Sequence, residues 1–308
     1  LYGEGADKAL ETLVPADICG LVVGRQRYTQ FTNARGGMED DLMVLRLADR
    51  LSLVVNASCK HQDIAHLKAH LEPKGIKVVP HPEWALLALQ GPKACEALAP
   101  LAPEAAKLVF MSGAEMSVNG IPCLVTRSGY TGEDGYEIAM PADKAEELAR
   151  ALLARPGVAP IGLGARDSLR LEAGLCLYGS DIDQTTSPIE ADLVWSIGKR
   201  RREEGGFAGD SVILAQLKNG AKRKRVGIKP EGRAPARAHT EIQDGQGRRI
   251  GEITSGGFGP SVDGPVAMGY VEADHAAPGT SVQLIVRDKA MPAKIVAMPF
   301  FPHRYFKG

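Results

Sequence analysis

The chain has 308 residues, and its 37 Lys and Arg balance 37 Asp and Glu, so the formal net charge is zero. A chain of this length suits two or three domains, and without a net charge it has no global attraction for nucleic acid or for a membrane surface. We therefore expect neither as a partner. Five scattered cysteines without a CxxC pair indicate reduced thiols. His66 and His70 could share a helix face, but we interpret this as an exposed polar face, so no metal is expected.

The N-terminal part of the chain alternates between predicted helices and strands. Amphipathic spacing predicts the helices, and short apolar runs bounded by Gly, Pro and Asn predict the strands. Asn119-Gly120 is the strongest turn signal and predicts a hairpin. The expected helices cover residues 5–15, 60–75, 93–102, 143–152 and 162–174, and the expected strands cover 27–33, 38–47, 51–58, the buried run 84–91, the hairpin 114–129, and 135–142.

The composition changes near residue 218, and no helical period appears beyond it. A basic connector is followed by short β-like runs between Gly and Pro, which is typical of a small antiparallel barrel or sandwich. The sequence therefore predicts an α+β fold, with a body over residues 1–218 and an all-β domain over residues 219–308. The expected strands of the second part lie within 225–230, 240–254, 266–273, 281–286 and 291–300.

The segment NARGGMEDDLMVL, residues 33–45, places three adjacent acids at the start of a predicted strand. Because side chains alternate along a strand, Asp40 and Asp41 are expected on opposite faces, each followed by apolar residues. One interpretation puts all three acids at the solvated mouth of the turn. In the other, at least one carboxylate lies in a dry environment, which raises its pKa and needs a cationic or hydrogen-bonding partner.

Three further segments carry candidate binding groups. Glu172 ends a predicted helix, where the dipole disfavours an anion, so it pairs with a nearby arginine or points at a ligand rich in N–H donors. The run Lys199–Arg202 follows a predicted strand ending at Trp195, and it forms either a solvated face or a site for an anionic group. The glycine-rich loop 126–138 around Tyr130 is not a P-loop, and it is either a pocket wall or an ordinary hairpin loop.

Together these segments resemble the aminomethyltransferase (T-protein) family of the glycine cleavage system. The matching stretches run in order from about residue 26 to the end. The longer ones are specific, and they include GGMEDDLMV (36–44), GARDSLRLEAGLCLYG (164–179), SPIEADLVWSIGKRRR (187–202) and MPFFPHRY (298–305). The resemblance implies a two-part folate-binding α+β body and a C-terminal antiparallel β-barrel, arranged as a cloverleaf around a central channel.

The resemblance also implies an activity and a set of site residues. Such enzymes transfer a methylene group from the aminomethyl group on the lipoyl arm of the H-protein to tetrahydrofolate, with release of ammonia. Asp41 matches the catalytic aspartate of the family motif. The residues that match folate contacts, or that are expected as walls of the folate pocket, are Glu172, Arg201, Tyr305, Asn56, Tyr130 and Tyr178.

Two alternatives share this scaffold: folate-dependent demethylases that act on other donors, and a non-enzymatic folate-binding class with a cysteine signature that GYTGEDGYE lacks. The run from Leu175 to Arg202 is closest to the glycine-cleavage branch. Family members carry roughly fifty residues before the equivalent of Leu1, so we expect a fragment or a processed chain. The resemblance implies the cytoplasm for a bacterial source and the mitochondrial matrix for a eukaryotic one.

Overall fold

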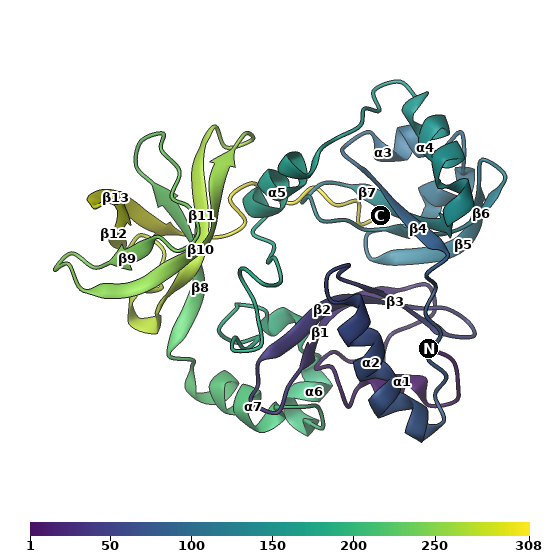
Figure 1. The fold of residues 1–308 in the computed structure, drawn as a ribbon, viewed down its shortest axis with the longest axis horizontal. Helices are drawn as coiled ribbons and strands as arrows, with labels where there is room; N and C mark the ends of the chain where they lie inside the picture. The colour runs from purple at the N-terminus through teal and green to yellow at the C-terminus, as the bar shows by residue number, and fades with distance from the viewer.

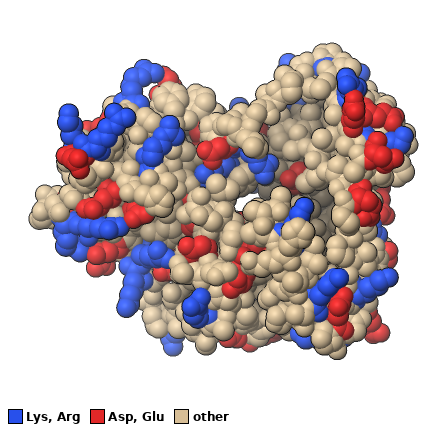
Figure 2. All heavy atoms as spheres, viewed as in Figure 1, with Lys and Arg blue, Asp and Glu red and all other residues tan.

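A computed structural model describes residues 1–308. Two α+β units and a β-barrel are arranged around the centre of the molecule (Figure 1). Figure 2 shows a hollow there, between the three parts. Each part has its own hydrophobic core, of 17, 15 and 12 buried residues respectively. The predicted α+β body and C-terminal barrel are thus confirmed. No helix combines the length and apolar content needed to cross a membrane.

The first unit is a three-stranded antiparallel sheet in the order β1-β2-β3. Its elements are α1 (Ala6–Leu10), β1 (Gln26–Thr32), β2 (Met38–Arg46), β3 (Leu51–Val55), α2 (Lys60–Leu71) and η1 (Glu72–Lys74), joined from later in the chain by α6 (Lys199–Glu204) and α7 (Asp210–Asn219). Phe31, Leu42 and Val44 alternate onto the face that packs with α1 and α2. The opposite face of the sheet carries Asp41.

The second unit is a four-stranded antiparallel sheet in the order β4-β7-β6-β5. Its elements are β4 (Trp84–Gln90), α3 (Ala94–Leu98), η2 (Pro103–Lys107), β5 (Ser112–Val118), β6 (Ile121–Arg127), β7 (Gly135–Pro141), η3 (Ala142–Lys144) and α4 (Ala145–Leu153). The predicted hairpin is confirmed: Asn119 and Gly120 have φ of 52° and 81°, the left-handed pair that a two-residue hairpin turn requires.

The prediction of a buried strand at residues 84–91 is wrong about burial. β4 is an edge strand that pairs only with β7, and its outward side chains are open to solvent. Trp84 and Leu86 are 36% and 46% exposed. An uninterrupted apolar run does not distinguish a strand covered on both faces from an edge strand with one open face.

The third part is a closed antiparallel barrel in the order β10-β11-β8-β13-β12-β9. Its strands are β8 (Arg223–Pro230), β9 (Glu241–Gln243), β10 (Arg249–Gly259), β11 (Gly264–Glu272), β12 (Ser281–Val286) and β13 (Lys289–Val296), with η5 (Ala273–His275) between β11 and β12. Closure removes the unpaired strand edges that a short open sheet would expose. The expected strands are all present.

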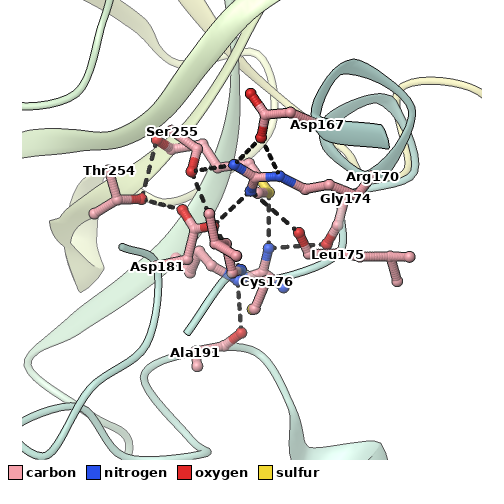
Figure 3. A network of polar contacts seen from close by, with 12 residues as sticks. Asp167, Arg170, Gly174, Leu175, Cys176, Asp181, Ala191, Thr254 and Ser255 are labelled. Carbon is pink, nitrogen blue, oxygen red and sulfur yellow. Dashed lines mark hydrogen bonds and ion pairs between the residues drawn. The ribbon is translucent and has the colours of Figure 1, made fainter. Parts of the chain in front are cut away.

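A buried polar network joins the barrel to helix α5 (Leu163–Glu172), as Figure 3 shows. Arg170 donates from Nη1 to Asp181 Oδ2 over 2.7 Å and from Nη2 to Ser255 Oγ of β10 over 3.0 Å. Ser255 Oγ also donates to Asp181 Oδ2 over 2.9 Å. Arg170 and Asp181 are 4% and 1% exposed, so this ion pair is held in a dry environment and fixes α5 against the barrel.

The segment before the basic run is not a strand, contrary to the prediction. Residues Val194–Ser196 form a short 3₁₀ turn, η4. Ser196 Oγ donates to the main-chain oxygen of Leu193, and Arg202 Nη2 donates to that of Val194 over 2.7 Å. Side-chain donors thus occupy carbonyls that a sheet ladder would have used.

The last residues of the chain leave the barrel and return to the second unit (Figure 1). The amide of Phe110 donates to the main-chain oxygen of Phe306 over 2.7 Å, and the amide of Arg304 donates to that of Gly132 over 2.9 Å. Tyr305 stacks on Phe110 with ring centroids 3.8 Å apart. The barrel is therefore attached to the rest of the molecule at both ends.

Candidate functional site

Asp41 lies on β2, on the face of the first sheet that is turned away from α1 and α2. The hydroxyl of Tyr28 donates to its Oδ2 over 2.7 Å, and Asn56 Nδ2 donates to its Oδ1 over 2.6 Å. Tyr28 is a diagonal neighbour across the β1–β2 ladder, because Gln30, two residues further on, pairs with Asp41. Asp41 is half-buried, so its carboxylate is held in place while part of it stays accessible.

Asn56 follows the end of β3 and connects the two faces of the sheet. Its amide nitrogen donates to Asp41 Oδ1 on one side and to Asp40 Oδ1 on the other, over 2.6 and 2.8 Å. Its main-chain N–H also donates to Asp40 Oδ2 over 3.2 Å. Asp40 is fully buried. The structure thus excludes the interpretation in which all three acids lie at a solvated turn.

Burial raises the pKa of Asp41 to about 6, and the negative charge of Asp40 acts in the same direction. The hydrogen bonds from Tyr28 and Asn56 oppose this rise because they stabilise the charged form. At neutral pH the carboxylate is mostly ionised but poorly hydrated. Such a group can stabilise a developing cation more strongly than a hydrated one can.

Two of the expected wall residues lie in the same region as Asp41. Tyr130 donates its hydroxyl to the main-chain oxygen of Cys176, and Tyr178 donates to that of Met38 over 3.2 Å. Burial raises the pKa of the Tyr130 hydroxyl, and the charge of Asp41 contributes to this rise. Cys176 packs with Met38 in a small core that also contacts Tyr28 and Tyr178. The structure therefore brings together Asp41, Asn56, Tyr130 and Tyr178.

Glu172 is 2% exposed and holds a barrel loop. The amides of Ser261 and Val262 donate to its Oε1 over 2.6 and 3.1 Å, and Ser261 Oγ donates to its Oε2 over 2.8 Å. The interpretation of a local ion pair with an arginine of its own helix is therefore wrong, because donors of the barrel loop, and no arginine, bind both carboxylate oxygens. The structure does not bring this carboxylate into contact with Asp41.

Arg201 is 5% exposed on α6 and contacts the N-terminal part of the chain. Its Nη2 donates to the main-chain oxygen of Glu11 over 2.7 Å, and its Nη1 lies 3.5 Å from Glu11 Oε2. The neighbouring Arg200 pairs with Glu11, Asp17 and Glu204. The interpretation of this run as a solvated face is wrong for Arg201, whereas 35% of the Arg200 side chain remains exposed. Arg201, like Glu172, does not contact Asp41.

Tyr305 lies between His303 and Phe110, in the tail that crosses the second unit. Burial raises the pKa of its hydroxyl to about 12. His303 Nε2 lies 2.8 Å from the main-chain oxygen of Ala173, beside Glu172. Glu172 and Tyr305 thus belong to neighbouring segments, at the C-terminal end of α5.

Sequence reasoning missed two aromatic residues next to Asp41. Tyr28 donates directly to its carboxylate, and the ring of Trp195 stacks on Tyr28 with centroids 5.3 Å apart. Trp195 is 62% exposed, so it offers an open aromatic face. The predicted hairpin register would have placed Tyr28 on the face of Asp41, whereas no local pattern signals that Trp195 lies there.

Comparisons with known proteins agree with this architecture. Residues 1–201 match the model of the GCVT N-terminal domain, and residues 223–302 match that of the glycine cleavage T-protein C-terminal barrel domain. The mitochondrial aminomethyltransferase of Solanum tuberosum is 48% identical over 100% of this chain and 78% of its own length. That of Gallus gallus is 45% identical over 99% of this chain and 80% of its own length.

A solved structure is similar over nearly the whole chain. The glycine cleavage system aminomethyltransferase T from Bartonella henselae is 44% identical, with a TM-score of 0.91 over 99% of this chain and 84% of that one. Both parts of the chain and its overall fold therefore give the same assignment. The chain belongs to the aminomethyltransferase family, the T-proteins of the glycine cleavage system.

Proposed function

We propose that this aminomethyltransferase transfers the methylene of an S-aminomethyl group, carried on the dihydrolipoyl arm of H-protein, to tetrahydrofolate. The C–N and C–S bonds of the aminomethyl group break, and two new C–N bonds form to N5 and N10 of the folate. The protons of these two nitrogens leave with ammonia and with the released thiol, so the products are ammonia, the dihydrolipoyl arm and 5,10-methylenetetrahydrofolate.

The observation that carries this proposal is the setting of Asp41. As the amine leaves, the methylene carbon becomes cationic, and a poorly hydrated carboxylate within reach stabilises that charge. Tyr28 and Asn56 fix the direction of the carboxylate before substrate arrives, so little reorganisation is needed during the reaction. The same oxygens are suited to accept hydrogen bonds from the folate nitrogens.

The remaining site residues are assigned on family resemblance and on position. We assign Asn56, Tyr130 and Tyr178 to the walls around Asp41. Glu172, Arg201 and Tyr305 are assigned to folate binding. The side chains of Glu172 and Arg201 are already bonded within the protein, but Glu172 Oε2 accepts only one hydrogen bond and Arg201 Nε has no partner, so each keeps bonding capacity for a ligand.

The resemblance supports three further assignments. H-protein and tetrahydrofolate are the proposed partners. Residues 1–218 are the proposed folate-binding body and residues 219–308 the proposed barrel domain. The relatives from potato and chicken are named as mitochondrial. We therefore assign the protein to the mitochondrial matrix if its source is eukaryotic, and to the cytoplasm if its source is bacterial. The names of these relatives do not favour the demethylase or the non-enzymatic alternative.

A transfer assay with purified aminomethylated H-protein and tetrahydrofolate tests the proposal, with ammonia and methylenetetrahydrofolate as readouts. Asp41→Asn keeps the size of the side chain but removes its charge, and we expect turnover to fall by about 10²–10³-fold, the range seen when one electrostatic stabiliser is lost. Asp49→Asn, at an exposed acid of the same unit, is the matched control and should leave turnover unchanged. A rate for Asp41→Asn within threefold of the unmodified protein would refute the assigned role.

A further inference from the structure

A second pair of carboxyl groups lies directly behind Asp41, on the helix side of the first sheet. Asp40 on β2 is fully buried, and Asp63 in the first turn of α2 is 1% exposed. The two carboxyl groups lie close enough for Asp40 to raise the pKa of Asp63. Two ionised carboxylates in contact in a dry environment repel one another strongly, so one of them keeps a proton.

The hydrogen bonds indicate which acid carries that proton. Asp40 accepts two hydrogen bonds, one on each oxygen, from the main chain and side chain of Asn56. Asp63 accepts none, and its Oδ2 is buried without a partner. A buried carboxylate without donors is costly, whereas a protonated one can donate to its neighbour. The proton therefore lies on Asp63, which donates it to Asp40.

The side chains that act most strongly on Asp63 carry no positive charge. From β2 these are the acids Glu39, Asp40 and Asp41, all of which act to raise its pKa. From the α2 side the Cys59 thiol interacts with Asp63, and His66 follows one helical turn later. Burial lowers the pKa of His66, so this ring is neutral at the pH at which the protein works.

Asn56 transmits the position of Asp40 to Asp41. An amide group has two hydrogens, and here the nitrogen lies within 2.8 Å of an oxygen of Asp40 and 2.6 Å of one of Asp41. If Asp63 lost its proton, the two adjacent carboxylates would repel each other and Asp40 would turn away. Asn56 would then lose one acceptor and no longer fix the position of Asp41.

We propose that Asp63 is a positioning residue for methylene transfer, whose carboxyl proton holds Asp40 and, through Asn56, fixes the carboxylate of Asp41. This inference rests on the proposed function, because it assigns Asp63 its role through Asp41. It also predicts that turnover falls at alkaline pH. Burial, together with the hydrogen bond and charge of Asp40, raises the pKa of Asp63 to about 8, so the proton stays in place below that pH and is lost above it.

The test compares two variants of Asp63 over a range of pH. In Asp63→Asn the amide donates to Asp40 as the protonated acid does, so we expect turnover at neutral pH within threefold of the unmodified protein. The alkaline fall, centred near pH 8 in the unmodified protein, should disappear in this variant. Asp63→Leu has no donor, and we expect about a tenfold or larger loss of kcat at neutral pH with little change in the KM for tetrahydrofolate.

Two outcomes of this assay would overturn the proposal. One is an alkaline limb in Asp63→Asn identical to that of the unmodified protein. The other is a kcat for Asp63→Leu equal to that of the unmodified protein. A purely structural role would not move the alkaline limb in a variant that keeps neutral-pH activity, so Asp63→Asn remains decisive even if Asp63→Leu fails to fold.

A readout without turnover separates this proposal from the proposed function. In ¹³C NMR of protein labelled at the aspartate carboxyls, one resonance should titrate near pH 8 and be absent in Asp63→Asn. The resonance that titrates near pH 6, from Asp41, should shift its midpoint in Asp63→Leu but not in Asp63→Asn. If no aspartate titrates above pH 7, the proton on Asp63 is refuted, whatever the transfer assay shows.

Discussion

Asp41 and Glu172 are both acids in the environment of the proposed folate site, but their oxygens have different partners. Asp41 is held by two side chains, Tyr28 and Asn56, and stays partly accessible. Glu172 accepts two main-chain amides and a hydroxyl from one barrel loop and is 2% exposed. The first arrangement can exchange a partner for substrate, whereas the second fixes the position of a loop. Substitution at the two sites should therefore affect different properties, activity at Asp41 and stability at Glu172.

Glu172→Ala should give the largest change in stability. It leaves two amides and a hydroxyl of the loop at Ser261 without their acceptor, and we expect the free energy of unfolding to fall by about 2–4 kcal/mol. Urea unfolding measures this loss, with Glu172→Gln as the matched control that keeps one carbonyl acceptor. Calorimetric titration of the folded variant with tetrahydrofolate should also show weaker binding. Unchanged affinity would remove Glu172 from the folate site, and unchanged stability would contradict the role of its loop contacts.

Arg201→Leu should also lower the free energy of unfolding, but by less than Glu172→Ala. Arg201 is buried and paired with Glu11, so its loss leaves a buried carboxylate with fewer partners. Because Arg200 also pairs with Glu11, we expect a loss of about 1–3 kcal/mol rather than the full cost of breaking a buried pair. Lys199→Leu, at an exposed position of the same helix, is the control and should lie within about 0.5 kcal/mol of the unmodified protein. Equal losses in the two variants would show that the Glu11 contact contributes nothing.

Of these variants, Tyr28→Phe should have the smallest effect, a shift in the pH profile of turnover. The hydroxyl stabilises the ionised form of Asp41, so its removal raises the pKa of Asp41 further above about 6. Because Asp41 acts when ionised, the acid limb of turnover should move to higher pH by roughly one unit, the equivalent of one hydrogen bond to a charged group. Tyr136→Phe removes a buried hydroxyl of the second unit and should leave the profile unchanged. An acid limb that stays in place would show that Asp41 does not control it.

Much of the fold follows from local patterns. The β1–β2 hairpin, the Asn119-Gly120 turn and the barrel strands were predictable, because alternation and turn residues are encoded within a few positions. Helix α5 was also expected, and it ends before Gly174, whose φ of 68° suits a glycine. The 3₁₀ turn at Trp195 was missed because the side chains of Ser196 and Arg202 take up main-chain oxygens of the turn, which the apolar pattern of the segment does not show.

The site was less predictable than the fold. Alternation placed Asp40 and Asp41 on opposite faces, and the structure confirms this. The partners of Glu172 and Arg201 could not be predicted from local spacing, since they lie 89 and 190 residues away in the chain. The contact between Asp63 and Asp40 likewise depends on how α2 packs on the sheet. Such tertiary contacts leave no periodic signal in the sequence.

The returning C-terminal tail limits how the three parts can move. A domain joined by a single linker swings freely about that hinge, whereas the barrel is anchored where β8 leaves the body and again where residues 304–306 bind the second unit. Together with the buried contacts of Arg170 and Glu172 to the barrel, these attachments oppose a wide separation of the three parts. We therefore expect the proposed dihydrolipoyl arm to enter through an opening of the assembled molecule rather than between separated parts.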